Sequence, residues 1–334
     1  MKKFNPKIIL IVIISCLIIL FGLYKITISK PIKSEKEIIM TIEEGETFYG
    51  ILNRLKEENK IKGLPFIKLY VKLLNKDIEV KPGEYIINSN STIDELIEDL
   101  TTGRSIDLVN FTVPEGYSID EIADKLELEG ICIKEEFIEA LKTYELPSYV
   151  ANKEGKRYAL EGYLFPDTYL IKKGESPQNI IKIMIERFEE VLKQVEEELG
   201  ISIENEDIED IIIKASIIEK EAVLDSERSK VASVINNRLN IHMKLQIDAT
   251  VIYALGEHVD TVLYDHLEID SPYNTYVNYG LPIGPISNPG IESIKATLKP
   301  EETDYLFYVL QNDKSHYFTN NYDDFLNKQE ELGY

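Results

Sequence analysis

The feature that most constrains this chain is an uncharged apolar run near its N-terminus, IILIVIISCLIILFGLY, from Ile8 to Tyr24. At a rise of about 1.5 Å per residue, a helix over this run just reaches across the hydrocarbon core of a bilayer. Lys7 and Lys25 flank the run, and two further lysines near the start make the N-terminal side basic. The run therefore predicts one transmembrane helix over 8–24, with residues 1–7 in the cytoplasm and the remainder on the other side.

A cleaved signal peptide is the alternative interpretation of the same run. The segment that follows, KITISKPIKSEKE, lacks a clear small-x-small cleavage site, and the run is longer than a usual signal core. We favour the uncleaved anchor, which predicts a single-pass protein of the cell membrane.

The charge and the cysteine content exclude several kinds of partner. The net charge is −22, so the phosphates of a nucleic acid would be repelled and no nucleic-acid partner is expected. Cys16 lies inside the apolar run and Cys132 outside it, so they cannot pair. The spacing typical of a metal-binding motif is not found among the four histidines, which are His242, His258, His266 and His316. We predict neither a metal nor another cofactor.

Two segments share one short pattern, EEGETFYGIL from residue 43 and PEGYSIDEIADKL from residue 114. Each predicts the end of a strand, a turn at glycine (Gly45 or Gly116) and an amphipathic helix. Between them, KPGEYIINSNSTIDELIEDLTTG predicts a strand and a helix capped by Ser91 or Thr92. After a polar linker over 25–36, residues 37–110 are therefore expected to form one small α+β module. The pattern resembles the LysM domain, and both a glycan-binding module and a plain spacer remain open.

Residues 111–334 are predicted to form one larger domain. Its clearest helix runs over 176–200, with Ser176 as cap, Pro177 in the first turn and Gly200 as the stop. A second helix is predicted over about 227–239, capped by Asp225 or Ser226.

A candidate general acid lies at the end of the apolar stretch IIIKASII, which is dense enough for a buried helix. Glu219 follows it directly, and desolvation would raise the pKa of its carboxyl, as a general acid requires. Glu221 is two residues further, about 200° around a helix, so the two carboxylates cannot face one pocket. At most one of them is the acid. The alternative is that both are surface groups beside Lys220.

Polar side chains in two later segments suit a sugar ligand. MKLQIDATVIYAL presents Gln246 and Asp248 between apolar residues, and SPYNTYVNYGLPIGPISNPG is rich in the residues of an ordered irregular loop. Uncharged polar and aromatic groups match sugar hydroxyls and the apolar faces of sugar rings. In that loop they are Tyr273, Asn274, Thr275 and Tyr276. In LEGYLFPDTYLI, Glu161 and Asp167 flank aromatic residues, a weaker pattern that also fits a packed turn.

Taken in order, the blocks EEGETFYGIL, LEGYLFPDTY, ASIIEKEA, SVINNRL, MKLQIDATVIYAL and YNTYVNYGLPIGPISNPG resemble the YceG-like (MltG-type) endolytic murein transglycosylases. The resemblance extends to the C-terminus. It implies a cofactor-free peptidoglycan lyase that cleaves the bond between N-acetylmuramic acid and N-acetylglucosamine and leaves a 1,6-anhydro end. It places the essential glutamate of the SIxEKE block on Glu219. It further implies a glycan groove lined by Gln246, Asp248, Tyr273, Asn274, Thr275 and Tyr276, with Glu161 behind it.

The resemblance also implies an α+β architecture with an N-terminal transmembrane helix, a small LysM-like α+β module over 37–110 and a larger mixed α/β catalytic domain over 111–334. The expected partners are peptidoglycan glycan strands and the membrane, and peptidoglycan synthases or cell-division proteins are candidates. The alternative function is a non-catalytic peptidoglycan-binding scaffold, and a hydrolase is a third possibility.

Overall fold

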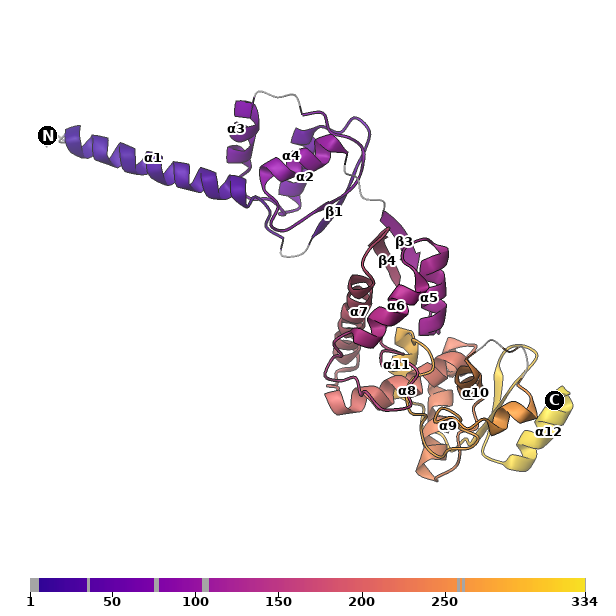
Figure 1. The fold of residues 1–334 in the computed structure, drawn as a ribbon. Helices are drawn as coiled ribbons and strands as arrows, with labels where there is room; N and C mark the ends of the chain where they lie inside the picture. The colour runs from indigo at the N-terminus through magenta and orange to yellow at the C-terminus, as the bar shows by residue number, and fades with distance from the viewer. Residues whose placement is uncertain are drawn as a thin grey trace. The chain divides into compact units, whose positions relative to one another are not determined.

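The computed structural model describes residues 6–34, 37–74, 78–103, 108–256, 259 and 262–333, with side chains from residue 14 onward. The chain divides into two compact units, Met1–Leu108 and Val109–Tyr334 (Figure 1). Within the described ranges, the chain forms helices and three two-stranded sheets, which confirms the predicted α+β class. Most of the predicted cytoplasmic tail, residues 35–36 of the linker and His258 lie outside the described residues.

The first helix, α1 (Pro6–Ser29), contains the predicted span but continues past Tyr24. It ends before Lys30 because the proline that follows Lys30 disfavours helical backbone there. Ile32 is buried in the core of unit 1, so the predicted linker over 25–36 is helical at its start and packed further on. Of the helices in the described residues, none has the length and apolarity to cross a membrane. The side chains of the predicted span before Ile14 lie outside those residues.

The remainder of unit 1 is a small two-stranded module. Strands β1 (Ile38–Ile42) and β2 (Gly83–Ile87) pair antiparallel, with Ile38 opposite Ile87 and Ile42 opposite Gly83. Helices α2 (Phe48–Glu57) and α3 (Leu64–Leu74) connect them, and α4 (Ile93–Thr102) follows. Thr92 caps α4 in a capping box with Glu95, as predicted.

The first part of unit 2 repeats the strand-turn-helix pattern. Strand β3 (Leu108–Thr112) leads through Gly116 to α5 (Ile119–Leu128), and β4 (Thr168–Lys172) pairs with β3. Gly116 has a φ of +77° and Gly45 in unit 1 a φ of +85°, a region open to glycine, which confirms the predicted turns. Helix α6 (Lys134–Thr143) and the long α7 (Pro177–Leu199) complete the core here. Ser176 caps α7 and Gly200 ends it, as predicted.

The second part of unit 2 is built on α8 (Asn205–Glu221), which packs against α9 (Arg228–Asn240) and α11 (Ile291–Leu298). A short 3₁₀ turn, η1 (Asp225–Glu227), precedes α9. The predicted caps Asp225 and Ser226 are wrong, because α9 starts at Arg228 and no side chain caps it. Asp225 instead binds Arg228 through its carboxylate. The loop region contains α10 (Asp248–Leu255) and η2 (Tyr264–Glu268).

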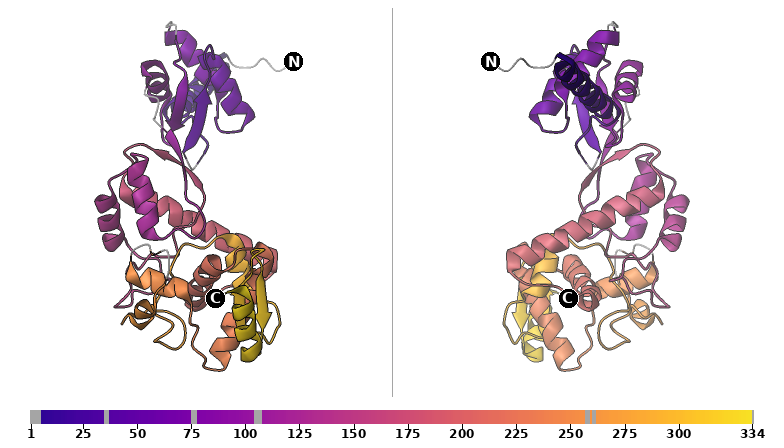
Figure 2. Two further views of the ribbon diagram at one scale, coloured as in Figure 1. Left: turned by 90° about the vertical axis from the view of Figure 1, so that its right-hand side faces the viewer. Right: turned by 90° about the vertical axis from the view of Figure 1, so that its left-hand side faces the viewer.

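The chain ends in a hairpin of β5 (Phe307–Leu310) and β6 (His316–Thr319), followed by α12 (Tyr322–Leu332). The strands pair antiparallel, with Phe307 opposite Thr319 and Leu310 opposite His316. Helix α12 packs on both strands, and Figure 2 shows them together in yellow. The hairpin brings the side chain of Tyr308 to the end of α8.

Candidate active site

Glu221, the last residue of α8, has the surroundings of a general acid. Its Oε2 accepts a hydrogen bond from the hydroxyl of Tyr308 at 2.8 Å, and the residue remains partly accessible. Burial raises the pKa of the Glu221 carboxyl, and the negative charge of Asp248 raises it further. The hydrogen bond from Tyr308 and the positive charge of Arg238 act in the opposite direction on this pKa. The net effect is a raised pKa, so the carboxyl stays protonated to a higher pH than an ordinary glutamate.

Asp248 and Tyr276 from the predicted groove interact with the charge of this carboxyl. The Tyr276 hydroxyl donates to Oδ1 of Asp248 at 2.6 Å. Asp248 is exposed at the start of α10, and Tyr276 is half-buried. Burial raises the pKa of Tyr276, and the hydrogen bond to Asp248 and the charge of Glu221 raise it further. Lys244 fixes the loop by donating to the backbone oxygen of Tyr276 at 2.9 Å.

A second layer of polar contacts holds Tyr308 and the strand that carries it. Arg238 donates to the backbone oxygens of Leu306 and Leu245, both at 2.6 Å, and so ties the hairpin to the segment before Asp248. The ring of His316 lies edge-on to that of Tyr308, with centroids 5.5 Å apart. Glu227 in turn binds His316, with 2.7 Å between Oε2 and Nδ1. These contacts fix the donor that orients Glu221.

Glu219, the predicted acid, lies in a different environment. Its Oε1 is 3.2 Å from Nη1 of Arg228, and its Oε2 accepts from Ser293 Oγ at 2.8 Å and Gly290 N at 3.0 Å. Glu219 is partly accessible as a residue, like Glu221, and its side chain is 7% exposed. Its carboxylate therefore joins α8 to α9 and α11 through one ion pair and two hydrogen bonds.

A further carboxyl lies beside Glu219. A Cβ atom at Gly290 would be 2.0 Å from Oε1 of Glu115, so that carboxyl occupies the space a side chain would need. Burial and the charge of Glu219 raise the pKa of Glu115. This cluster contains the carboxyl groups of Glu115 and Glu219, and both oxygens of Glu219 are bound by protein groups.

Three of the predicted groove residues are buried supports of the loop. Tyr273 accepts a hydrogen bond from the backbone N of Arg157 at 3.2 Å. Asn274 donates to two backbone oxygens of the preceding segment, both at 2.9 Å. Thr275 accepts from the backbone N of Ile247 at 3.0 Å. Gln246 is exposed and has a φ of +47°, and its backbone N donates to the oxygen of Thr275 at 3.2 Å. Gln246, Asp248 and Tyr276 thus stay accessible, while the other three shape the loop.

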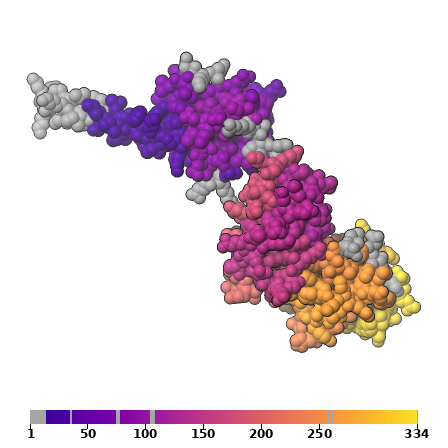
Figure 3. Space-filling view, viewed as in Figure 1, coloured from indigo at the N-terminus to yellow at the C-terminus, as the bar shows by residue number. Residues whose placement is uncertain are grey.

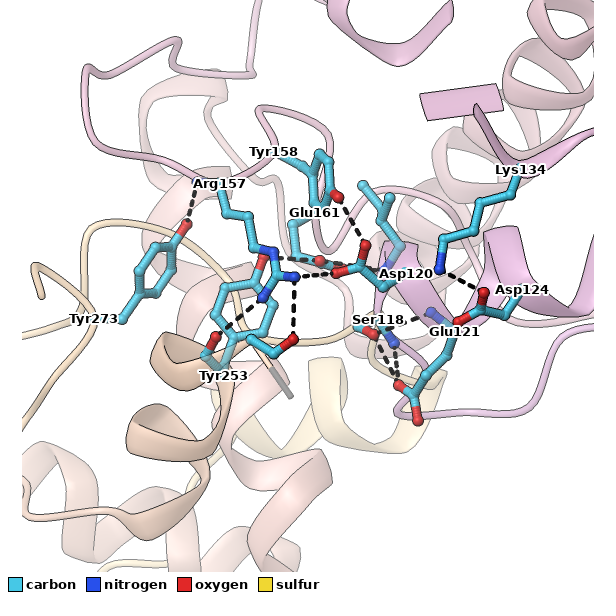
Figure 4. A network of polar contacts seen from close by, with 12 residues as sticks. Ser118, Asp120, Glu121, Asp124, Lys134, Arg157, Tyr158, Glu161, Tyr253 and Tyr273 are labelled. Atoms are coloured by element: carbon cyan, nitrogen blue, oxygen red, sulfur yellow. Dashed lines mark hydrogen bonds and ion pairs between the residues drawn. The ribbon is translucent and has the colours of Figure 1, made fainter. Parts of the chain in front are cut away.

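Glu161 is completely buried at the centre of the polar network in Figure 4. Its carboxylate accepts hydrogen bonds from Ile119 N at 3.1 Å, Asn288 Nδ2 at 3.1 Å and the Tyr253 hydroxyl at 2.9 Å. Burial raises the pKa of Glu161 to about 8, against the effect of these donors. It connects three distant segments and has no direct access to a ligand. Asp167, from the same sequence block, binds Arg187 at 2.7 Å.

Sequence reasoning missed the convergence on Glu221. Tyr308 lies in a strand with no local signal, and His316 was only one of four scattered histidines. The contact between Glu221 and Tyr308 spans 87 residues, which no short motif encodes. In the part of the chain that the structure describes, no group of three or more His, Cys, Asp or Glu side chains is placed to hold a metal ion.

Comparison with known proteins assigns the family. The YceG-like family model matches residues 40–331. The endolytic murein transglycosylase of Bacillus subtilis (strain 168) is 35% identical over 312 residues, 89% of this chain and 86% of that protein. The same-named protein of Streptococcus pneumoniae (strain D39) is 30% identical over 320 residues, and the match spans 57% of its length. A crystal structure of a yceG-like protein from Listeria monocytogenes has a TM-score of 0.59 and 32% identity, covering 88% of this chain and 99% of that one. The chain belongs to the YceG-like family.

Proposed function

We propose that this chain is an endolytic lytic transglycosylase of peptidoglycan and that Glu221 is its general acid and base. The names of the relatives support the reaction class. The observation that carries the residue assignment is the environment of Glu221, a hydrogen-bonded carboxyl whose pKa is raised by burial and by the charge of the exposed groove residue Asp248.

The reaction needs one carboxyl acting twice. Protonated Glu221 gives its proton to the glycosidic oxygen as the bond from that oxygen to the anomeric carbon of N-acetylmuramic acid breaks. The ionised Glu221 then takes the proton of the 6-hydroxyl of the same sugar, while that oxygen bonds to the anomeric carbon and closes the 1,6-anhydro ring. Because the nucleophile is tethered to the substrate, a second catalytic carboxylate is not needed. No water is consumed.

Glu221 fits this role better than Glu219, the residue expected from the sequence. A general acid must hold a proton and reach the substrate, whereas the Glu219 carboxylate is occupied by Arg228, Ser293 and a backbone donor. In this proposal Glu219 supports the end of α8 from behind. The exposed groups of Asp248 and Gln246 and the half-buried Tyr276 bind the glycan, and Tyr308 orients the Glu221 carboxyl.

A hydrolase is the second candidate, because Asp248 lies close enough to Glu221 to raise its pKa. Two neighbouring carboxylates are the usual equipment of a glycoside hydrolase. A non-catalytic peptidoglycan scaffold would bind strands and leave them intact.

Product analysis on purified glycan strands separates these functions. The full chain in detergent is incubated with the strands and the released ends are weighed by mass spectrometry. The transglycosylase gives 1,6-anhydro ends, lighter by one water than the reducing ends of a hydrolase. The Glu221→Gln variant serves as the matched inactive control. Reducing ends, or no cleavage by the unmodified chain on strands that it binds, would overturn the proposal.

We also propose that α1 anchors the chain in the cell membrane with unit 2 outside the cytoplasm. The apolar run from Ile8 to Tyr24 and the exposed apolar side chains of the described part of α1 support this. Unit 1 beyond α1 is proposed as a LysM-like module that binds glycan or serves as a spacer. Peptidoglycan synthases or division proteins are the proposed partners. Alkaline carbonate extraction of membranes tests the anchor, since an integral protein stays in the pellet.

A further inference from the structure

Helix α3 in unit 1 is apolar on two opposite faces. Ile67 and Val71 point into the core and are buried. On the other side of the helix Leu69 is 49% exposed and Leu73 is 68% exposed, with Phe66 half-buried beside them. Residues four apart lie on one face, so the two leucines form one apolar stripe along the outside of α3. A helix of a water-soluble module normally carries polar residues there.

The outer face of α3 adjoins the end of α1. The ring of Tyr24 contacts the rings of Phe66 and Tyr70, with both centroid distances 6.3 Å. Thr27 is buried against Gly63, where an added Cβ would lie 2.4 Å from the threonine methyl. The end of α1 is therefore packed tightly against the start of α3. Figure 3 shows the described part of α1, in indigo, projecting from the module to which its end is fixed.

The charge of these two helices differs from that of the whole chain. The chain has 59 acidic residues and a net charge of −22, yet neither α1 nor α3 contains Asp or Glu. Their charged residues are lysines, with Lys68 and Lys72 on the flank of the apolar stripe and Lys25 next to Tyr24. On α4, Asp94 accepts a hydrogen bond from the hydroxyl of Tyr70 at 2.5 Å. Aromatic, apolar and lysine side chains together are typical of a membrane–water interface.

We infer that α3 lies in the outer interface of the membrane, with Leu69 and Leu73 in the lipid and its lysines at anionic headgroups. This inference rests on the proposed anchoring by α1, because the packing of Thr27 on Gly63 places α3 where α1 leaves the bilayer. The apolar stripe therefore contacts an anionic lipid surface. The lysines of α3 are complementary to its charge, and the stripe continues the apolar surface of α1. This contact between α3 and the lipid holds unit 1 against the membrane.

Depth-dependent quenching in reconstituted vesicles tests this inference. An environment-sensitive fluorophore is attached to single cysteines of the full chain, and lipids carrying a spin label quench it when it is buried. Native Cys16 in α1, kept alone by Cys132→Ala, reports the anchor. In a background that also lacks Cys16, Leu73→Cys reports α3. Ile39→Cys, an equally apolar exposed position on β1, is the matched control.

The expected result is strong quenching at positions 16 and 73 and none at position 39. On vesicles with anionic lipid, Lys72→Glu should lower the ratio of membrane-bound to unbound α3 by about fivefold or more. Each basic residue near an anionic surface strengthens binding by about that factor. Quenching at 16 but not at 73 would overturn the seating of α3 and leave the anchor intact. Absence of quenching at both positions would refute the anchor and the inference together. If position 73 is protected from a water-soluble maleimide only in native membranes, a protein partner covers the stripe and the lipid assignment is wrong.

Discussion

Glu219 and Glu221 are two residues apart on one helix, yet they have different partners. Glu219 is bound by Arg228 on α9 and by Ser293 and the backbone N of Gly290 at the start of α11. Glu221 meets a tyrosine donor and a neighbouring anion, and burial raises its pKa. A step of two residues turns a side chain by about 200°. The difference shows that a carboxyl becomes a candidate acid through what the rest of the fold brings to it, and that its place in a motif is a weaker guide.

The largest effect should come from neutralising Glu221 while keeping its shape. Glu221→Gln removes the transferable proton, and we expect the rate of strand cleavage to fall by about 10²–10⁴-fold. Glu219→Gln should keep the rate within about tenfold of the unmodified chain, because both oxygens of its carboxyl are already bound by protein groups. Both rates are measured as release of anhydro ends from glycan strands.

The same two variants also test whether Glu221 or Glu219 is the general acid. If Glu219→Gln abolishes cleavage in folded protein and Glu221→Gln does not, the sequence-based assignment to Glu219 is correct and the geometric one fails. Circular dichroism of both variants ensures that lost activity is not lost structure.

A third carboxyl, Glu161, extends the comparison to a group with no solvent access. Its pKa of about 8 in the folded state exceeds the usual 4.5. The stability it contributes is therefore fully present below pH about 4.5 and is lost as the pH rises toward about 8, by about 3–5 kcal/mol. Glu161→Gln cannot ionise, so this part of the pH dependence should disappear. Calorimetric unfolding at pH 5 and pH 8 measures it, and equal pH dependence in both proteins would contradict the raised pKa.

Much of the fold could be predicted because its signals are local. The caps of α4 and α7, the glycine turns before α2 and α5, and the buried face of α8 all follow from neighbouring residues. The helix predicted from about 227 starts at Arg228, but its cap was wrong, because Asp225 binds the side chain of Arg228. Glu227 binds His316, which lies 89 residues away.

The site was predicted only in part, because contacts between residues distant in the sequence decide which of its polar groups are free to bind a ligand. Asp248 and Tyr276 were expected from their residue types, and the structure joins them by a hydrogen bond. Their loop neighbours Asn274 and Thr275 carry suitable polar groups but use them on the protein itself. Local sequence shows which groups are available and does not show which of them are already bonded in the fold.

A smaller effect on stability should distinguish Glu219 as a structural residue. Glu219→Gln replaces a charge-assisted contact with Arg228 by a neutral one, and we expect the free energy of unfolding to fall by about 1–3 kcal/mol. Asp225→Asn is a matched control because Asp225 binds the same arginine but its side chain is 81% exposed. That variant should cost less than about 1 kcal/mol. Equal losses in chemical denaturation would show that the burial of Glu219 adds nothing.

The smallest effects should be two opposite shifts in the pH dependence of cleavage. A general acid must be protonated, so activity falls as the pH rises through the pKa of Glu221. Asp248→Asn removes a charge that raises this pKa and should move the alkaline limb to lower pH. Tyr308→Phe removes a hydrogen bond that lowers it and should move the limb to higher pH. Each shift should be up to about one unit in profiles of kcat/KM. Shifts in the same direction, or none in either variant, would mean that the titrating acid is a different group, because no carboxyl remote from both side chains can respond to them with opposite signs.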